Sequence, residues 1–324
     1  MNRTLAMLAA LLMAAISVSS ACMANPTTDL RFELKPSTRA GEIQLALWSG
    51  SDRHHGLMGS SFTSNELSGI DVAALRQSGE RPVRFAYVRE PGRVDCIGTA
   101  VNAVATGRCT FTENAAFSEF LASRGVGRPT GEQAYELTMT GATRDLVESL
   151  AQYRYPRPNV EKLAELSAVG VDRRLIAGLA GHSYTPATLD DLTQFAALDV
   201  TPEYIDAIAR AGYPGLSADD ITQLKAVGVD PAFIAALASA GYSKLSADEL
   251  VQMAALDIDP AFISEFARIG YAHLPVDTLV QLKALDVTPE YVQAVAAQGF
   301  GDLTPERLVQ MKALGFTPRA PRHH

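Results

Sequence analysis

Residues 217–242 have the sequence SADDITQLKAVGVDPAFIAALASAGY, and residues 246–271 have the related sequence SADELVQMAALDIDPAFISEFARIGY. The two segments are offset by 29 residues without a gap. A Gly-Tyr or Gly-Phe pair recurs at the same step, beginning at residues 212, 241, 270 and 299. Self-similarity at a period of roughly 20–50 residues is typical of repeat proteins. The chain is therefore predicted to contain an array of one small structural unit.

Each unit is predicted to form two short helices. Ser217 and Ser246 are each followed three residues later by an acidic residue, a pattern that caps a helix N-terminus. The apolar residues of the segment 221–227 then follow at the spacing of one helical face. Asp230-Pro231 is suited to begin the second helix, because proline lacks only an N–H group that the first turn leaves unbonded. Gly241 is suited to end it.

The repeated units are expected to stack into an α-solenoid of 29-residue helix pairs that covers residues 114–318. One pair is too short to bury its own apolar face, whereas stacked neighbours can bury it together. The first helices of the units are expected to begin at Thr130, Asn159, Thr188, Ser217, Ser246, Pro275 and Thr304. Leu224, Met253, Leu282 and Met311 should occupy equivalent buried positions. The last unit lacks its second helix, and residues 319–324 are predicted to be a tail.

Residues 25–113 do not share the 29-residue step, and they are predicted to form a small antiparallel β-domain. The segments RFELKP, EIQLALWSG, VRFAYVRE, GRVDCIGT and RCTFTE are short and rich in β-branched and aromatic residues. Turn-forming residues separate them, as in hairpins. One short helix is expected near residues 72–76. The predicted fold class is α+β, with this β-domain followed by the solenoid.

The N-terminal residues 1–24 have the pattern of a secretory signal peptide. Arg3 precedes an apolar run that is too short for a membrane span, and small residues follow the run. Cleavage could follow Ala21 or Ala24. No other stretch is long and apolar enough to span a membrane, so the mature chain is expected to be soluble in the periplasm or secreted. The alternative is a lipoprotein anchored through Cys22, because SSAC loosely resembles a lipobox.

Cys96 and Cys109 are the two cysteines that follow the predicted signal peptide. If the intervening chain folds as a hairpin about Asn102 and Ala103, the two cysteines lie opposite each other. In an oxidising compartment this arrangement favours a cross-strand disulfide. The alternative is a pair of buried thiols, since free cysteine is common in protein cores.

The charge is distributed unevenly along the chain. The net charge is −8 overall, about +1 over residues 25–129 and about −12 over residues 130–318. An acidic chain argues against nucleic-acid binding, which needs a basic face. An acidic repeat surface favours a basic protein partner, whose approach it would steer. The alternative is that the acidity serves only solubility.

Two further residue types recur at the 29-residue step. Aromatic residues recur at Tyr155, Tyr184, Tyr213, Tyr242, Tyr271 and Phe300, where packing between units is the expected role. Glutamines recur at Gln194, Gln223, Gln252, Gln281 and Gln310. Amide hydrogen bonds between units would explain the glutamines structurally. The functional hypothesis is that they line a binding surface.

No stretch of the sequence carries a recognisable catalytic or metal-binding motif. His54-His55 lacks a third ligand at helical spacing, so a solvated loop is the expected role. Gly181-His182-Ser183 resembles part of a nucleophile elbow, but no strand precedes it and Thr185 stands at the fifth position. The repeat register instead places it between two helices. No cofactor, metal or catalysed reaction is expected.

The segments LVQLKALDVTPEYVQAV and LVQMKALGFTP resemble repeats in the C-terminal extracytoplasmic regions of BlaR/MecR-type antirepressor metallopeptidases and their stand-alone secreted relatives. The segment VRFAYVREPGRVDCIGTA resembles the β-segment that precedes those repeats. The sequence lacks the multispanning part and the zinc motif of the full-length proteins, so protease activity does not carry over. The resemblance implies a sensor or scaffold module in the cell envelope.

The expected function is therefore binding of a protein or ligand through the repeat surface of an exported protein. The alternative is a hydrolase of envelope polymer with its site in the β-domain. Converging carboxylate and histidine side chains buried in that domain would favour the hydrolase. A smooth surface lined by the repeats would favour the binding protein.

Overall fold

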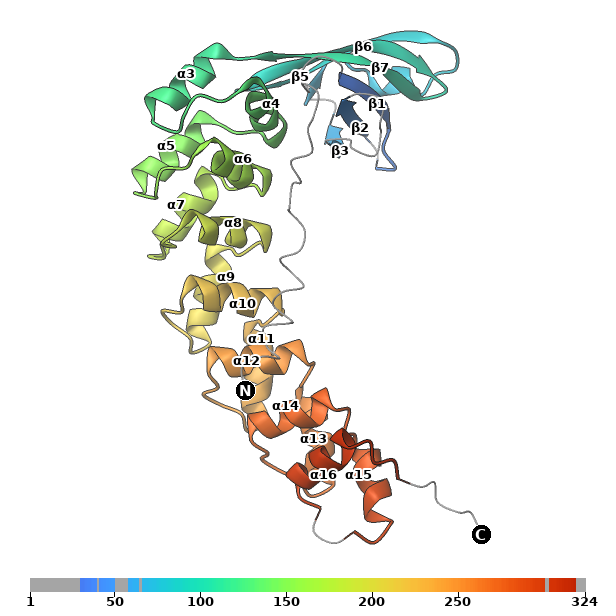
Figure 1. Cartoon of the computed structure of the whole chain (residues 1–324), viewed down its shortest axis with the longest axis vertical. Helices are drawn as coiled ribbons and strands as arrows, with labels where there is room; N and C mark the ends of the chain where they lie inside the picture. Colours follow the sequence, from blue (N-terminus) through green and yellow to red (C-terminus); the bar gives the residue numbers. More distant parts are fainter. Residues whose placement is uncertain (1–29, 40, 50–57, 64–65, 301–302, 319–324) are drawn as a thin grey trace. The chain divides into compact units, whose positions relative to one another are not determined.

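The structure of the chain is a computed structural model that describes residues 30–39, 41–49, 58–63, 66–300 and 303–318 (Figure 1). The predicted signal peptide with Cys22, the pair His54-His55 and the predicted tail lie outside these residues. The described chain forms two compact units. One extends to Arg144 and also includes residues 159–164, and the other comprises residues 145–158 and the residues from Glu165 onward. The predicted domain boundaries stay predictions.

The first unit contains an antiparallel sheet of seven described strands in the order β3-β2-β1-β7-β6-β5-β4. The strands are β1 (Leu30–Pro36), β2 (Glu42–Ser49), β3 (Met58–Thr63), β4 (Leu67–Ser68), β5 (Arg81–Arg89), β6 (Gly92–Val101) and β7 (Val104–Glu113). Helix α2 (Val72–Leu75) confirms the short helix expected near residues 72–76. The sheet is followed by helices α3–α16, which confirms the α+β fold class.

One face of the sheet carries the core of the first unit. Side chains alternate between the two faces of a strand, so every second residue of β1 is buried, as at Leu30, Phe32 and Leu34. The Phe32 and Phe85 rings meet edge to face with centroids 5.0 Å apart. Helix α4 (Gly131–Thr140) covers this face and contributes Tyr135 to the same core. The opposite face is left without a covering helix among the described residues.

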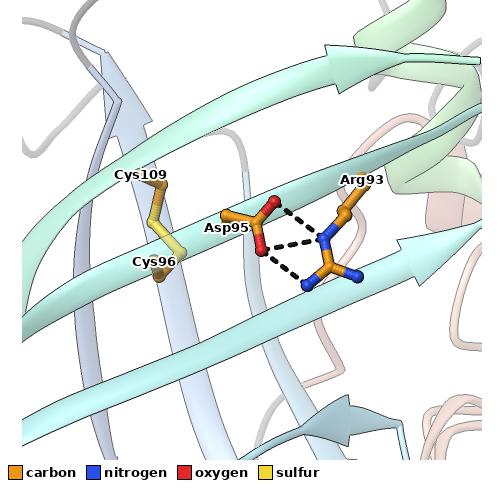
Figure 2. The surroundings of a disulfide bond; sticks show 4 residues. All are labelled: Arg93, Asp95, Cys96 and Cys109. Carbon is orange, nitrogen blue, oxygen red and sulfur yellow. Dashed lines mark hydrogen bonds and ion pairs between the residues drawn. A yellow bond between two sulfur atoms is a disulfide. The ribbon is translucent and has the colours of Figure 1, made fainter.

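A disulfide joins the two central strands. Cys96 and Cys109 are directly paired in the register of β6 and β7, and their Cα atoms lie 4.1 Å apart (Figure 2). The hairpin turns at Asn102 and Ala103, which both have positive φ, as the two-residue turn that matches strand twist requires. The predicted disulfide is therefore present in the structure. On the opposite face of the same strand, Asp95 pairs with Arg93 at 2.7 Å.

Two glycines face each other next to the disulfide. Gly98 and Gly107 are paired in the same register. A Cβ atom at Gly107 would lie 2.1 Å from the backbone oxygen of Ile97 and 2.7 Å from the Phe32 ring. The close approach of these two strands therefore depends on the absence of side chains at both positions.

Gly107→Ala should destabilise the first unit by about 1–3 kcal/mol, because backbone atoms must move to admit the methyl group. Urea unfolding followed by tryptophan fluorescence measures this change, since Trp48 lies in β2. Gly131→Ala is the control, because a Cβ atom there meets nothing within 4 Å. Equal stability of the two variants would contradict the packing argument.

Helices of about nine residues make up the rest of the chain. They are α3 (Ala115–Ser123), α5 (Arg144–Gln152), α6 (Val160–Ala168), α7 (Arg173–Gly181), α8 (Leu189–Ala197), α9 (Pro202–Arg210), α10 (Ala218–Ala226), α11 (Pro231–Ser239), α12 (Ala247–Ala255), α13 (Pro260–Arg268), α14 (Val276–Ala284), α15 (Pro289–Ala296) and α16 (Pro305–Ala313). The even-numbered helices from α8 to α16 contact one another in succession. Helices α7 and α9 are also in contact.

The predicted capping residues begin these helices. Ser217 and Ser246 form complete capping boxes with Asp220 and Glu249. Asp230 accepts a hydrogen bond from the Phe233 backbone N–H at 2.7 Å, with Pro231 in the first turn. Pro275 stands at the N-terminus of α14 in the position that Ser217 and Ser246 hold in α10 and α12, and it provides no side-chain hydrogen bond. Local residues therefore define where most helices begin, because each cap satisfies an otherwise unbonded N–H group.

The turn after each even-numbered helix repeats as well. Its residue with positive φ is a glycine in some units and an aspartate in others, as at Gly228 and Asp257. Aspartate is one of the few residues besides glycine that adopts this conformation readily. The backbone conformation of this turn is therefore the same in repeats that have glycine and in repeats that have aspartate at this position.

A continuous apolar core runs from α9 to α16 in the second unit. Leu224, Met253 and Leu282 are buried at equivalent positions of α10, α12 and α14. Met311 of α16 is only partly buried, since no further helix follows it in the described chain. The predicted equivalence therefore holds for the interior helices and weakens at the end of the series.

Tyrosine hydroxyl groups of the second unit donate hydrogen bonds to backbone carbonyls 25 or 32 residues later in the chain. Tyr184, Tyr242 and Tyr271 each donate to the backbone carbonyl 32 residues later, of Leu216, Leu274 and Leu303. A second series joins Tyr204 to Val229 and Tyr291 to Phe316, each 25 residues apart. Tyr184, Tyr242 and Tyr271, three of the six recurring aromatic residues, therefore have a structural role in joining turns of the second unit.

Tyr242→Phe should lower the free energy of unfolding by about 0.5–1.5 kcal/mol, because the variant loses its hydroxyl bond to Leu274 at 2.7 Å. Tyr213→Phe is the matched control, since the described residues provide no hydrogen bond to the hydroxyl of Tyr213. Thermal unfolding followed by circular dichroism compares them. A loss as large in the control as in Tyr242→Phe would show that the hydroxyl bond is not the cause.

Candidate functional site

The five recurring glutamines occupy one position of five consecutive even-numbered helices. Gln194, Gln223, Gln252, Gln281 and Gln310 are each the sixth residue of α8, α10, α12, α14 and α16. Three of them are exposed, and Gln223 and Gln252 are half-buried. Because these helices contact one another in succession, the glutamines form one row across the second unit.

The described hydrogen bonds of this row run along a helix. The amide nitrogen of Gln223 donates to the Asp219 carboxylate at 2.8 Å, four residues earlier in α10. No described hydrogen bond joins a glutamine side chain of the row to a neighbouring helix. The three exposed glutamines of the row are therefore accessible to a partner.

An acidic residue lies four positions before each of these glutamines. This second row was missed in the sequence analysis, although it follows the same 29-residue step. Its members are all exposed: Asp190, Asp219, Asp248, Asp277 and Glu306. Residues four apart lie on the same face of a helix, so the acidic row runs beside the glutamine row.

A third row consists of exposed alanines at the last position of the same helices. They are Ala197, Ala226, Ala255, Ala284 and Ala313. Positions two, six and nine of a helix share one face, because their spacings are four and three residues. We call the fifteen residues of the acidic, glutamine and alanine rows the acid–glutamine face. It combines carboxylates and amides with small side chains that do not obstruct a partner.

The spacing of helices concentrates negative charge on this face. Packed helices lie about 8–10 Å apart, so neighbouring carboxylates of the acidic row are expected at a similar distance. This distance is close to the screening length at physiological ionic strength, about 8 Å. A partner with several cations along one line would therefore meet several carboxylates at once.

Lysines of the same helices are directed to aromatic rings. Lys225 lies 4.8 Å from the centre of the Tyr204 ring, and Lys312 lies 4.7 Å from that of Tyr291. Lys283 lies 4.7 Å from the Phe262 ring. These contacts hold the ammonium groups by cation–π attraction at the odd-numbered helices. The acidic row therefore keeps its negative character.

The first unit has glutamates at the corresponding positions of its own helices. Glu132 and Glu136 occupy positions two and six of α4, and Glu161 occupies position two of α6. Partial burial, with repulsion from Glu132 and then Glu161, raises the pKa of Glu136 above 4.5. Carboxylates on successive helices are thus close enough to affect one another's ionisation.

A contact between a histidine and an aspartate lies outside the acid–glutamine face. Gly181 is the last residue of α7 and His182-Ser183 follow it, so this segment lies at the end of a helix and no strand precedes it. His182 Nδ1 lies 2.6 Å from Asp206 Oδ2 of α9. The nearby hollow of about 490 Å³ is lined by residues of α7, α8 and α9 and of the turns that precede α7 and α9, including Arg174 and Glu203. Both members of the pair are partly exposed.

The described residues contain no group of three or more His, Cys, Asp or Glu side chains arranged to hold a metal ion. The buried polar side chains of the described chain are Ser37, Ser118, Thr138 and Ser149. No single described helix is long and apolar enough to cross a membrane, although α10 and α11, bent by 80°, meet the length and composition criteria as a pair. No protein-family model and no curated protein matches this sequence.

Glu136→Gln should stabilise the protein near pH 7. The folded state raises the pKa of Glu136, so ionisation of this group opposes folding, and that cost is absent below about pH 4.5 and grows as the pH rises. Urea unfolding at about pH 7 and about pH 4 should show a gain in the variant that shrinks at the lower pH.

Glu203→Gln is the control of opposite sign. Hydrogen bonds from its own backbone N–H and from the Thr201 side chain lower the pKa of Glu203, so its ionisation favours folding. This variant should gain nothing near pH 7. A gain for Glu203→Gln, or none for Glu136→Gln, would contradict the proposed electrostatics.

Proposed function

We propose that the helices form an α-solenoid and that its acid–glutamine face binds a basic segment of a protein partner. The observation that carries this proposal is the repetition of an exposed Asp or Glu, an exposed or half-buried Gln and an exposed Ala on five helices in contact. The recurring tyrosine bonds support the solenoid, because they join equivalent turns at a constant separation. Solenoids commonly bind partners along such extended surfaces.

The proposed partner is an extended chain with regularly spaced cations. Five packed helices span roughly 32–40 Å between the outer members of the row. An extended peptide covers this distance with about 10–12 residues. Its lysines would approach the carboxylates, and its backbone amides would bond to the glutamines, whose side chains both donate and accept.

We further propose that the protein acts in the cell envelope. The signal-peptide pattern of residues 1–24 and the disulfide Cys96–Cys109 support export to an oxidising compartment. The resemblance of the repeats to extracytoplasmic regions of BlaR/MecR-type proteins supports a scaffold or sensor role there. Intact-mass measurement of chain purified from the envelope fraction should give an unlipidated mature protein, and a mass that requires acylated Cys22 would contradict plain secretion.

The binding test uses a fluorescein-labelled peptide of alternating Lys and Ser that is long enough to cross the row. A variant with Asp219→Asn, Asp248→Asn and Asp277→Asn should bind it roughly tenfold more weakly, a change of about 1.4 kcal/mol. Gln223→Ala, Gln252→Ala and Gln281→Ala together should also weaken binding. Fluorescence anisotropy at low and high salt measures both effects, and high salt should reduce the difference due to charge.

The matched control removes the same charge from the ends of the even-numbered helices. Asp199→Asn, Asp257→Asn and Asp286→Asn alter exposed residues of the turns, where asparagine also tolerates positive φ. This variant should bind the peptide within about twofold of the unmodified protein. Equal weakening in the two variants would show that only net charge matters, as the solubility hypothesis holds.

A further inference from the structure

The outer face of the sheet carries aliphatic side chains that meet solvent. Ile97 at the centre of β6 is 61% exposed. Val88 of β5, Val101 of β6 and Val104 of β7 are 44%, 47% and 38% exposed. Strand alternation places these residues on the face opposite the core, where Cys96 and Val94 of β6 are buried. Clustered exposed aliphatic residues indicate a contact surface.

Arginines flank the most exposed of these residues. The strand register aligns Arg84 of β5, Ile97 of β6 and Arg108 of β7 in one row across the sheet, and it continues to Arg31 of β1. Arg84 and Arg108 are exposed, and no carboxylate in the described residues pairs with them. We call Arg84, Ile97 and Arg108 the arginine row.

The carboxylates described on the same face lie outside this row. Asp95 of β6 is bound by Arg93 at 2.7 Å (Figure 2). The register pairs Asp95 with Ala86 and Thr110, so it lies beside the row rather than in it. Glu33 of β1 lies opposite Thr106 of β7. With Arg31 and Lys35 of β1, the described positions of the outer face carry more cationic than acidic residues, although the whole chain is acidic.

The arginine row has the spacing of the acidic row. Neighbouring strands lie about 4.7–4.9 Å apart, so Arg84 and Arg108, two strands apart, are separated by about 9.5 Å across the sheet. Packed helices, and with them successive carboxylates such as Asp219 and Asp248, are about 8–10 Å apart. Two arginines can therefore meet two consecutive carboxylates, while Ile97 between them faces the alanine and glutamine side chains.

We propose that the arginine row of one molecule binds the acid–glutamine face of a second copy of this chain. This inference rests on the proposed function, because it names a partner for that face. The two surfaces differ, so the contact is head to tail, and each bound molecule presents a further sheet and a further acidic face. The molecules would associate into linear assemblies. These assemblies would become longer as the protein concentration rises and shorter as the salt concentration rises.

The experiment uses two variants of the chain from Asn25 to the C-terminus, oxidised at Cys96 and Cys109. The sheet variant carries Arg84→Glu and Arg108→Glu, and the helix variant carries Asp219→Lys and Asp248→Lys. Sedimentation velocity at low salt should show assembly of the unmodified protein and at least a tenfold weaker association for each variant alone. An equimolar mixture of the two should form dimers and stop there, because only one functional contact remains.

The matched control places the same charge change elsewhere on the first unit. Arg76→Glu and Arg128→Glu alter exposed arginines that lie outside the sheet strands. This variant should assemble like the unmodified protein. Circular dichroism establishes that each variant is folded, and Arg84→Gln with Arg108→Gln replaces the glutamate variant if that one unfolds.

Three results would overturn the inference. The unmodified protein could stay monomeric at every concentration and at low salt, or the control could dissociate as much as the sheet variant. The sheet variant could also lose binding to phosphatidylglycerol vesicles while no self-association is seen, which would assign the arginine row to a lipid surface. If the unmodified protein binds the Lys/Ser peptide in any of these cases, the proposed function stands. If it does not bind the peptide, the proposed function is refuted independently of self-association.

Discussion

Contact between successive short helices is the interaction on which the second unit depends. A helix of nine residues is about 13 Å long and is not stable alone in water. Its caps define where it begins, but its stability comes from burial of one apolar face against neighbours. Leu224 and Met253 illustrate this, since each is fully enclosed by residues of the same core. Each short helix is therefore stabilised by the helices that pack against it.

This dependence also explains the regularity of the exposed face. The buried positions of the even-numbered helices must repeat if each helix is to pack on the next in the same way. The remaining positions are then exposed on every helix at the same place, and their side chains form rows. Packing does not dictate which side chains fill these rows. The recurrence of acidic residues and glutamines there, rather than any polar residue, is what suggests a common partner.

The sheet of the first unit follows a different constraint. Its strands are held together by backbone hydrogen bonds, by the Cys96–Cys109 disulfide and by the close approach of Gly98 and Gly107. One face is filled by aromatic and aliphatic side chains and by Tyr135 of α4. The other face carries arginines beside exposed Ile97. A protein with an acidic helical face and a basic sheet face has the charge asymmetry that head-to-tail association requires.

The sequence by itself determined the local structure of this protein. Repeated capping residues, helical spacing and Gly-Tyr pairs predicted where helices begin and end, and hairpin turns predicted the sheet and the pairing of Cys96 with Cys109. These features depend on contacts within a few residues or across one turn. Only the tertiary structure decided which positions are exposed together. The acidic row beside the glutamines depends on which helices touch. The alignment of Arg84 with Arg108 depends on the exact register of β5, β6 and β7, and their exposure depends on which face of the sheet the core covers, so neither follows from periodicity along the chain.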